Sequence, residues 1–161
     1  MSDVHSAGAA AGERSARRRG AARPRLDVLA MIAVGGVLGA EARYAVGVLL
    51  PHTRDAWPWS TLLINVSGCV LIGVLMVVIT ELLYGHRLVR PFLGVGLLGG
   101  YTTFSTATVE ALTLISAGRP GTAIGYLVAT PALAVLGCGA GVVTARLLAG
   151  RSPRRPAEAA R

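Results

Sequence analysis

Four long apolar segments determine what this chain of 161 residues can fold into. A helix needs about 20 apolar residues to cross the hydrocarbon core of a bilayer. Segments of that length, separated by short polar connections, cover approximately residues 26–50, 56–83, 91–117 and 120–148. Charged residues make up 15% of the chain and lie mostly at its ends and in the connections, whereas soluble domains mix about 25% charge throughout. The sequence therefore predicts an all-α integral membrane protein with four transmembrane helices.

Arginine, which provides all 16 basic residues, is distributed unequally between the two sides of this predicted bundle. Six arginines precede the first segment, two lie between the second and third, and five end the chain. The remaining connections contain only Arg54 and Arg119, and Arg43 lies within the first segment. By the positive-inside rule, both termini are expected to be cytoplasmic, in a multi-pass protein of the cell membrane.

The two ends, residues 1–25 and 149–161, are rich in Ala, Gly, Ser, Pro and Arg, which predicts disordered basic tails around a channel domain of residues 26–148. Basic tails can bind nucleic acid or anionic lipid. We interpret them instead as flanks that set the topology, with the lipid bilayer as partner and no nucleic acid.

Cysteine and histidine indicate neither catalysis nor metal binding. Cys69 and Cys138 lie in apolar segments, where small core residues are expected rather than a disulfide or a metal pair. His5, His52 and His86 are scattered over the tail and the connections without ligand spacing. With no nucleophile constellation either, the sequence predicts that the protein is not an enzyme.

The third segment is unusual for the centre of a membrane helix, because residues 99–106 read GGYTTFST. Two flexible glycines precede β-branched threonines, which are mediocre helix formers. Irregular backbone at membrane depth is tolerated only where protein buries it or where it lines a polar cavity. Two interpretations remain open here. One is a helix broken near Gly99–Thr103, with carbonyls able to hold a cation; the other is a kinked helix whose hydroxyls bond their own backbone.

Three motifs together resemble those of the Fluc (CrcB) family of fluoride channels. Residues 35–44, GGVLGAEARY, are similar to the first-helix pattern G-G-x-x-G-A-x-x-R-Y of that family. Residues 57–68, WPWSTLLINVSG, are similar to the start of its second helix, and residues 99–106 followed by Glu110 resemble its third-helix signature. The motifs occur in order, and the likeness extends over about residues 26–148.

The resemblance implies an antiparallel dimer of inverted subunits that exports fluoride from the cytoplasm and so relieves its toxicity. Anions would pass through pores at the subunit interface. A structural sodium ion (Na+) would lie at the dimer centre, held by the backbone carbonyls of Gly99 and Thr102 from each subunit. The fluoride pathway would use the amide, ring-edge and hydroxyl groups that match the family motifs: Asn65, Phe104, Ser105, Thr106, Tyr126 and Thr130.

The chemistry of these groups suits fluoride, which is small and tightly hydrated. Neutral N–H and O–H donors, together with the positive edge of an aromatic ring, can replace hydration water without binding the ion too tightly. Structural roles remain open beside these: Asn65 could bond a neighbouring helix, and Tyr126 could anchor at the interface. Arg43 is expected to shape a vestibule. Glu110 suits structural hydrogen bonding and a role in the ion path equally well.

The chain departs from the family pattern at Ala107, where a second phenylalanine is usual. Alanine offers no ring edge, so the pore on this surface would lack half of its aromatic pair. The arginine bias also fixes one orientation in the membrane, whereas a subunit that pairs with an inverted copy of itself needs balanced flanks. Both features favour the hypothesis of a heterodimer with an oppositely oriented homologous subunit.

Two other functions are compatible with a small basic membrane protein. A proton-coupled multidrug or cation exporter would need a carboxylate inside the membrane, and Glu41 could provide it. That alternative leaves the third-helix motif unexplained. A membrane anchor whose basic tails recruit a partner is the other alternative, and it would lose its function if the tails were removed.

Overall fold

The computed structural model describes residues 26–82 and 87–150, and every regular element in these ranges is helical. The prediction of an all-α protein is therefore confirmed for the described part. The tails predicted at 1–25 and 149–161 lie outside it, apart from positions 149 and 150. In chain order the elements are α2 (Leu26–Leu49), α3 (Trp59–Val77), the π-helix η1 (Val78–Leu82), the π-helix η2 (Arg90–Leu98), α4 (Gly99–Tyr101), α5 (Ser105–Ser116) and α6 (Pro120–Leu148).

Three helices in the described ranges are long and apolar enough to cross a membrane: α2, α3 extended to Thr80, and α6. At 1.5 Å per residue, the 24 residues of α2 span about 36 Å, which exceeds a hydrocarbon core of about 30 Å. The third predicted segment, 91–117, is a series of shorter helices, η2, α4 and α5. Of the four predicted transmembrane helices, three are thus confirmed by length and composition.

The third segment leaves helical geometry between α4 and α5. Thr102 is extended, with φ −77° and ψ 156°, and the helix resumes at Ser105. Gly99 and Gly100 are helical, so the interruption lies at residues 102–104, at the C-terminal edge of the range in which the sequence predicts it. The threonines, and not the glycines, are therefore the residues at which the helix breaks.

Local sequence explains where two helices begin or end. α2 ends two residues before Pro51, in keeping with the steric restriction that proline imposes on the residue before it. Gly118 has a positive φ of 76°, which a side chain would disfavour, and it turns the chain between α5 and α6. Pro120 then starts α6, at a position where its missing N–H costs no helical bond.

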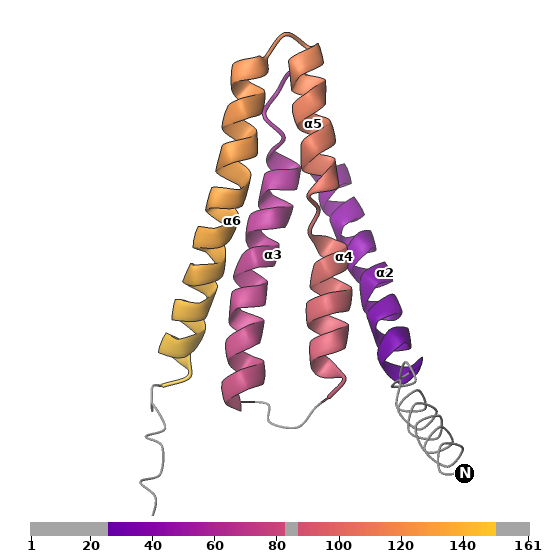
Figure 1. Ribbon diagram of the computed structural model, residues 1–161, viewed down its shortest axis with the longest axis vertical. Coiled ribbons are helices and arrows are strands. Elements are labelled where there is room, and N and C mark those ends of the chain that lie inside the picture. The colour runs from indigo at the N-terminus through magenta and orange to yellow at the C-terminus, as the bar shows by residue number, and fades with distance from the viewer. Residues whose placement is uncertain (1–25, 83–86, 151–161) are drawn as a thin grey trace, which may run out of the picture.

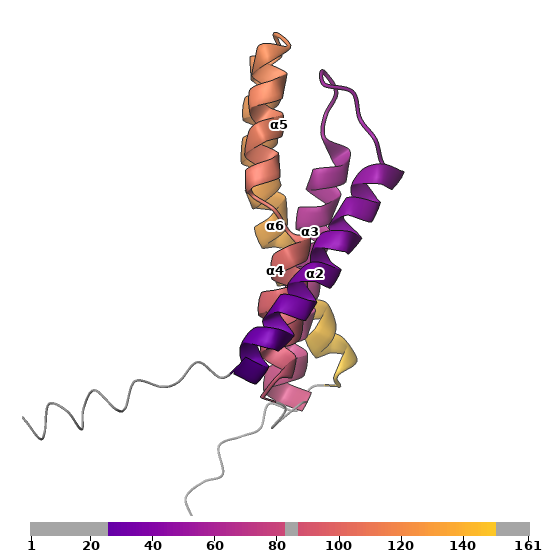
Figure 2. The ribbon, with the colours of Figure 1, turned by 90° about the vertical axis from the view of Figure 1, so that its right-hand side faces the viewer.

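The helices form an elongated bundle in which α3 lies between α6 and the third segment (Figure 1). α3 packs mainly against α6, α2 packs against η2 and α4, and α5 packs against α6. Figure 2 shows α2 crossing the third segment near the break. The first residues of α2 and the last of α6 lie at one end of the bundle, and the α2–α3 and α5–α6 connections lie at the other (Figure 1).

Glycine allows two of these packed seams. A Cβ atom added to Gly35 would come within 2.5 Å of the Phe92 carbonyl oxygen, and one added to Gly96 would come within 2.7 Å of the Ile32 carbonyl oxygen. The facing glycines therefore bring the backbones of α2 and η2 into direct contact, as small residues do in membrane helices. On α6, Gly141 likewise meets the backbone of Val70 in α3.

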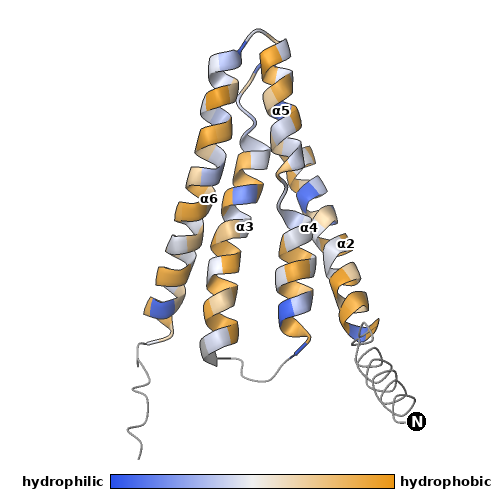
Figure 3. Cartoon of the chain, in the orientation of Figure 1, coloured by the Kyte–Doolittle hydropathy of each residue, from blue (hydrophilic) through white to orange (hydrophobic). Residues whose placement is uncertain are grey.

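Apolar residues occur along the whole length of the helices (Figure 3), and many of the large ones are exposed. Large side chains such as Leu38, Leu71 and Val135 are 49%, 49% and 72% exposed. The buried core is small by comparison and consists of Leu62, Ala107, Ala111, Leu114, Ala123 and Tyr126. A chain that leaves so many large apolar side chains uncovered is suited to a lipid environment or to a partner subunit.

Candidate functional site

A polar cavity of about 480 Å³ lies where α2, α3, the break and α5 meet. It is the candidate functional site because hydroxyl, guanidinium and carboxylate groups converge on it inside an otherwise apolar bundle. Two of these elements, α2 and α5, contribute residues that the sequence singled out, namely Arg43 from α2 and Ser105, Thr106 and Glu110 from α5. Its polar lining consists of Arg43, Tyr44, His52, Ser60, Thr61, Thr103, Ser105, Thr106 and Glu110.

The broken backbone is held to α3 by one side chain, Asn65. Its Oδ1 accepts the Thr103 N–H at 2.8 Å, and its Nδ2 donates to the Thr103 carbonyl at 2.8 Å. Asn65 is 8% exposed, so both bonds are made out of contact with solvent. The amide thus satisfies backbone groups that a continuous helix would have satisfied itself, and this leaves one N–H of Asn65 beyond these two bonds.

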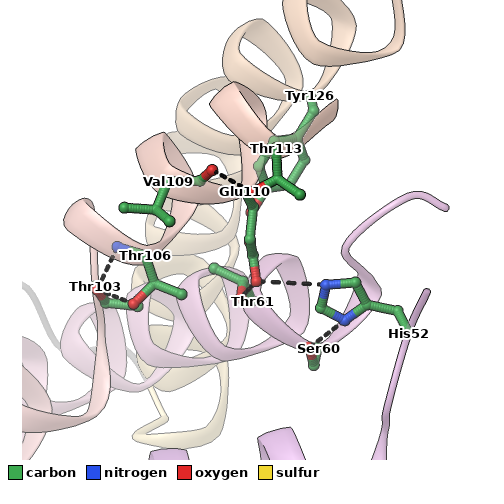
Figure 4. Close-up of polar contacts among 9 residues, drawn as sticks. All are labelled: His52, Ser60, Thr61, Thr103, Thr106, Val109, Glu110, Thr113 and Tyr126. Carbon is green, nitrogen blue, oxygen red and sulfur yellow. Dashed lines mark hydrogen bonds and ion pairs between the residues drawn. The ribbon is translucent and has the colours of Figure 1, made fainter. Parts of the chain in front are cut away.

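The hydroxyl of Thr103 starts the next helix. Thr103 Oγ1 accepts the backbone N–H of Thr106 at 3.2 Å and donates to Thr106 Oγ1 at 3.0 Å (Figure 4). It also lies 3.3 Å from Ser105 Oγ. A side-chain oxygen that accepts an N–H of the first turn acts as a helix cap. Ser105 and Thr106 are exposed on the cavity side of α5, so their hydroxyls can bind a ligand there.

Two backbone carbonyls at the break lose their usual helical donors. In a continuous helix the Thr103 N–H would bond Gly99 and the Thr106 N–H would bond Thr102. These N–H groups instead donate to Asn65 and to Thr103 Oγ1. Carbonyl oxygens released in this way are the hard ligands that Na+ or another hard cation takes, so the break fits the predicted ion. Arg43 Nη1 also approaches the Thr102 carbonyl, at 3.4 Å.

Glu110 is the centre of a second polar cluster, at the α2–α3 connection. Thr61 Oγ1 donates to its Oε1 at 2.7 Å, and the Tyr126 hydroxyl donates to its Oε2 at 2.8 Å. His52 Nε2 lies 3.6 Å from Oε1, and His52 Nδ1 lies 3.3 Å from Ser60 Oγ. Figure 4 shows these side chains converging from α3, α5, α6 and the connection.

The structure brings some of the predicted pathway residues to the cavity and places others away from it. Ser105 and Thr106 line the cavity, as do Arg43 and Glu110. The other four predicted pathway residues do not line the cavity. Asn65 lies behind Thr103, Tyr126 lies behind Glu110 with no exposed surface, Thr130 bonds the Tyr126 carbonyl of its own helix at 2.8 Å, and Phe104 points outward with 78% of its surface exposed.

Five polar residues of the cavity were not predicted as site residues from the sequence: Tyr44, His52, Ser60, Thr61 and Thr103. Thr61 had a usable signal, since it precedes Asn65 by four residues and thus shares a helix face with it. His52 had none, because its contact with Glu110 joins residues far apart in the chain. Glu41 is exposed on α2 and does not line the cavity.

Helical elements throughout the described residues, three of them apolar and of membrane-spanning length, with polar side chains gathered at a broken helix, are typical of a small integral membrane protein. The family model described as "CrcB-like protein, Camphor Resistance (CrcB)" matches residues 30–142. This chain belongs to the CrcB family.

Curated relatives align with 60–81% of this chain. The chain is 52% identical over 115 residues to fluoride-specific ion channel FluC 2 of Streptomyces avermitilis, covering 71% of this chain and 73% of the relative. FluC 2 of Nocardia farcinica is 47% identical over 133 residues, covering 81% and 95%. FluC 3 of Streptomyces avermitilis is 46% identical over 97 residues, covering 60% and 48%. All three are named as ion channels, and ion channels are not enzymes.

Proposed function

We propose that this chain is a subunit of a fluoride-selective channel that exports fluoride from the cytoplasm. The cavity beside the broken helix supports this most directly, because the exposed hydroxyls of Ser105 and Thr106 lie on it. Hydroxyl donors can replace the water around a small anion with bonds of similar strength. Membership of a family whose relatives are named fluoride-specific channels points to the same ion.

Charge near the cavity attracts the anion without trapping it. Arg43 lines the cavity, and its guanidinium also bonds the Thr102 carbonyl at 3.4 Å. Glu110 lies on the same cavity, and its carboxylate offsets that positive charge. Conduction needs binding strong enough for entry and weak enough for exit. A nearly balanced pair of charges, with neutral donors between them, meets both requirements.

The pore is completed by a second subunit, inserted antiparallel to the first. Phe104 supports this arrangement, because an aromatic side chain that is 78% exposed beside the break is available to whatever covers this face. Asn65 contributes to the pore the second N–H of its amide, which is not used in the bonds to Thr103. In this dimer Tyr126 positions Glu110, and Thr130 continues the polar track along α6.

A structural Na+ at the dimer centre would be held by the carbonyls of Gly99 and Thr102 from both subunits. The redirected N–H groups of Thr103 and Thr106 support this assignment, since they leave those carbonyls without helical donors. The ion would supply positive charge that fixes the two breaks against each other. The chain itself contributes the extended backbone at Thr102 that turns its carbonyl out of the helix.

The partner in this proposal is an oppositely oriented relative of this chain. Ala107 is 2% exposed and packs in the core, so this chain has neither a ring nor free surface at that position. The arginine bias gives the chain a single orientation, with both termini in the cytoplasm. Streptomyces avermitilis has at least two FluC relatives, so one organism can contain two different proteins of this family.

Fluoride efflux from liposomes tests the proposal. We expect fast fluoride loss when this chain is reconstituted with an oppositely oriented relative, slow loss with either chain alone, and no need for a proton gradient. Phe104→Ile should reduce the flux while the dimer stays intact on a sizing column. Full flux from the chain alone would contradict the heterodimer, and proton-driven export of an organic cation would favour the exporter that uses Glu41.

A further inference from the structure

His52, in the connection between α2 and α3, is a cavity residue of a type that changes its charge near neutral pH. We propose that His52 makes the Glu110 end of the cavity proton-sensitive, so that its imidazolium form offsets the Glu110 carboxylate and raises the affinity of the cavity for small anions such as fluoride. This inference rests on the proposed channel function and adds a regulating residue to the same site.

The His52 imidazole lies beside the Glu110 carboxylate. His52 Nε2 lies 3.6 Å from Glu110 Oε1, and the two side chains are 26% and 15% exposed. Both groups are therefore accessible to water, His52 more than Glu110. The pair sits at the end of the bundle that carries the α2–α3 connection, opposite the end where α2 begins and α6 finishes (Figures 1 and 4).

Ser60 allows the imidazole to take up a proton without losing a hydrogen bond. Its Oγ lies 3.3 Å from His52 Nδ1. When Nδ1 is unprotonated, the Ser60 hydroxyl donates to it; when Nδ1 carries a proton, the same oxygen accepts. In both states Nε2–H faces Glu110. The site therefore accommodates the neutral and the charged ring in one geometry.

The other positively charged groups that line these cavities keep a constant charge, so the proton gained by His52 is the change that matters. From α2, Arg43 and Tyr44 line the same cavity, and from the connection Arg54 shares a smaller cavity of about 220 Å³ with His52 and Glu110. Arginine stays charged at every accessible pH, so these two groups give a constant background. A proton gained by His52 then adds one positive charge to the mouth of an anion path, where such a charge raises the local anion concentration.

The positive charge on His52 matters because the Glu110 carboxylate lies beside it. Glu110 accepts the hydroxyls of Thr61 and Tyr126 at 2.7 and 2.8 Å, and these bonds hold the carboxylate at the cavity wall. A carboxylate fixed there repels an approaching anion. Protonated His52, the nearest positive group in this cluster, reduces that repulsion. We expect fluoride flux to rise about threefold to tenfold as the pH falls from about 8 to about 6.

Fluoride efflux at equal pH on both sides of the liposome tests this, with the channel in the subunit composition that conducts. His52→Gln should give a low flux and His52→Arg a high flux, and both should be independent of pH. The chain offers a matched control in its two other histidines, His5 and His86. The double variant H5Q/H86Q should keep the wild-type profile. Protein-free liposomes give the background from permeation of hydrogen fluoride.

A binding measurement that needs no flux separates the two possible failures. With nitrogen-15-labelled histidine in the full chain, the His52 signal is assigned by its loss in His52→Gln. Fluoride should shift this signal at about pH 6 and much less at about pH 8. No fluoride flux at any pH would contradict the channel itself. The role of His52 alone would be overturned if wild type and His52→Gln showed fluoride flux with the same pH profile. It would also be overturned if fluoride did not shift the His52 signal at either pH.

Discussion

The third segment, residues 90–116, has two halves that hold the bundle together in opposite ways. Its first half, η2 and α4, packs backbone to backbone against α2, through Gly96 and Gly100 facing Gly35 and Gly36. Its second half, from the break into α5, meets α3 through hydrogen bonds, above all between Asn65 and Thr103. Direct backbone contact leaves no room for an ion, whereas the broken half leaves polar groups beside a cavity.

This difference shows how a chain with little polar surface can build an ion site in a membrane. Glycine seams fix the helices without using any polar side chain, so hydroxyls and amides can be concentrated at one break. The break in turn depends on those side chains, because its backbone groups have no helical partners. Stability and function should therefore respond differently to changes in the two halves.

The largest loss of stability is expected when the polar half loses Asn65. Asn65→Leu keeps the approximate size of the side chain but leaves the buried N–H and carbonyl of Thr103 without partners. At about 1–3 kcal/mol for each stranded group, the free energy of unfolding should fall by about 2–6 kcal/mol. Thermal unfolding in detergent measures this. Thr130→Val is the control, since its hydroxyl bonds only its own helix, and an equal loss in both variants would contradict the role of Asn65.

A smaller loss is expected in a glycine seam. A Cβ atom at Gly141 would meet the backbone of Val70, whereas one at Gly139, on the same helix, has nothing within 4 Å. Gly141→Ala should therefore cost about 1–3 kcal/mol through overpacking, and Gly139→Ala should be nearly neutral. Comparison of the two melting curves checks this directly. Equal melting temperatures would show that α3 and α6 do not meet at Gly141.

Tyr126 should give a loss of similar size or slightly smaller, because one hydrogen bond is removed and the ring stays in place. Tyr126→Phe deletes the hydroxyl that donates to Glu110 Oε2 at 2.8 Å, at a position with no exposed surface. We expect a cost of about 1–2 kcal/mol. Tyr44→Phe, at a side chain 70% exposed, is the matched control and should change little. An equal change in the two variants would contradict the role of the Tyr126 hydroxyl.

The smallest effect is expected in the connection between α2 and α3. A hydrogen bond from the Thr53 side chain, followed by one from backbone, lowers the pKa of Asp55 below its usual 3.8. A carboxylate with a lowered folded-state pKa stabilises the fold fully above its unfolded pKa, and the stabilisation fades as the pH falls through the folded value. Asp55→Asn should remove this slight acid dependence. Since Asp55 is fully exposed, melting curves below about pH 4 should differ only marginally between the two proteins.

Much of the apolar half of this comparison could be predicted from the sequence. Segment length is a local property, and so is the four-residue spacing of Gly35 with Gly39 and of Gly96 with Gly100, which lie in one seam of the structure. The position of the break was also foreseeable to within a few residues, because Thr102 and Thr103 are poor helix formers. What the sequence could not give was the division of the third segment into short pieces.

The polar half was harder to predict because its contacts join residues far apart in the chain. Asn65 and Thr103 are separated by 38 positions, and Thr61 and Glu110 by 49. The motifs predicted Asn65 as a residue of the fluoride pathway, but they did not predict its hydrogen bonds to the backbone of Thr103. They placed Tyr126 and Phe104 together in one pathway, yet one is fully buried and the other is 78% exposed. Burial depends on tertiary packing, and no local pattern contains it.

Fluoride efflux from variants of α5 tests the central claim most directly, namely that neutral hydroxyls on the cavity replace the water around fluoride. The double variant S105A/T106V removes both exposed hydroxyls. Thr108→Val, on the same helix, removes one that bonds the Phe104 carbonyl at 3.1 Å. With the channel in its conducting subunit composition, we predict a loss of about tenfold or more for the double variant and near wild-type flux for Thr108→Val. Equal flux in the two, with both proteins folded, would contradict the account.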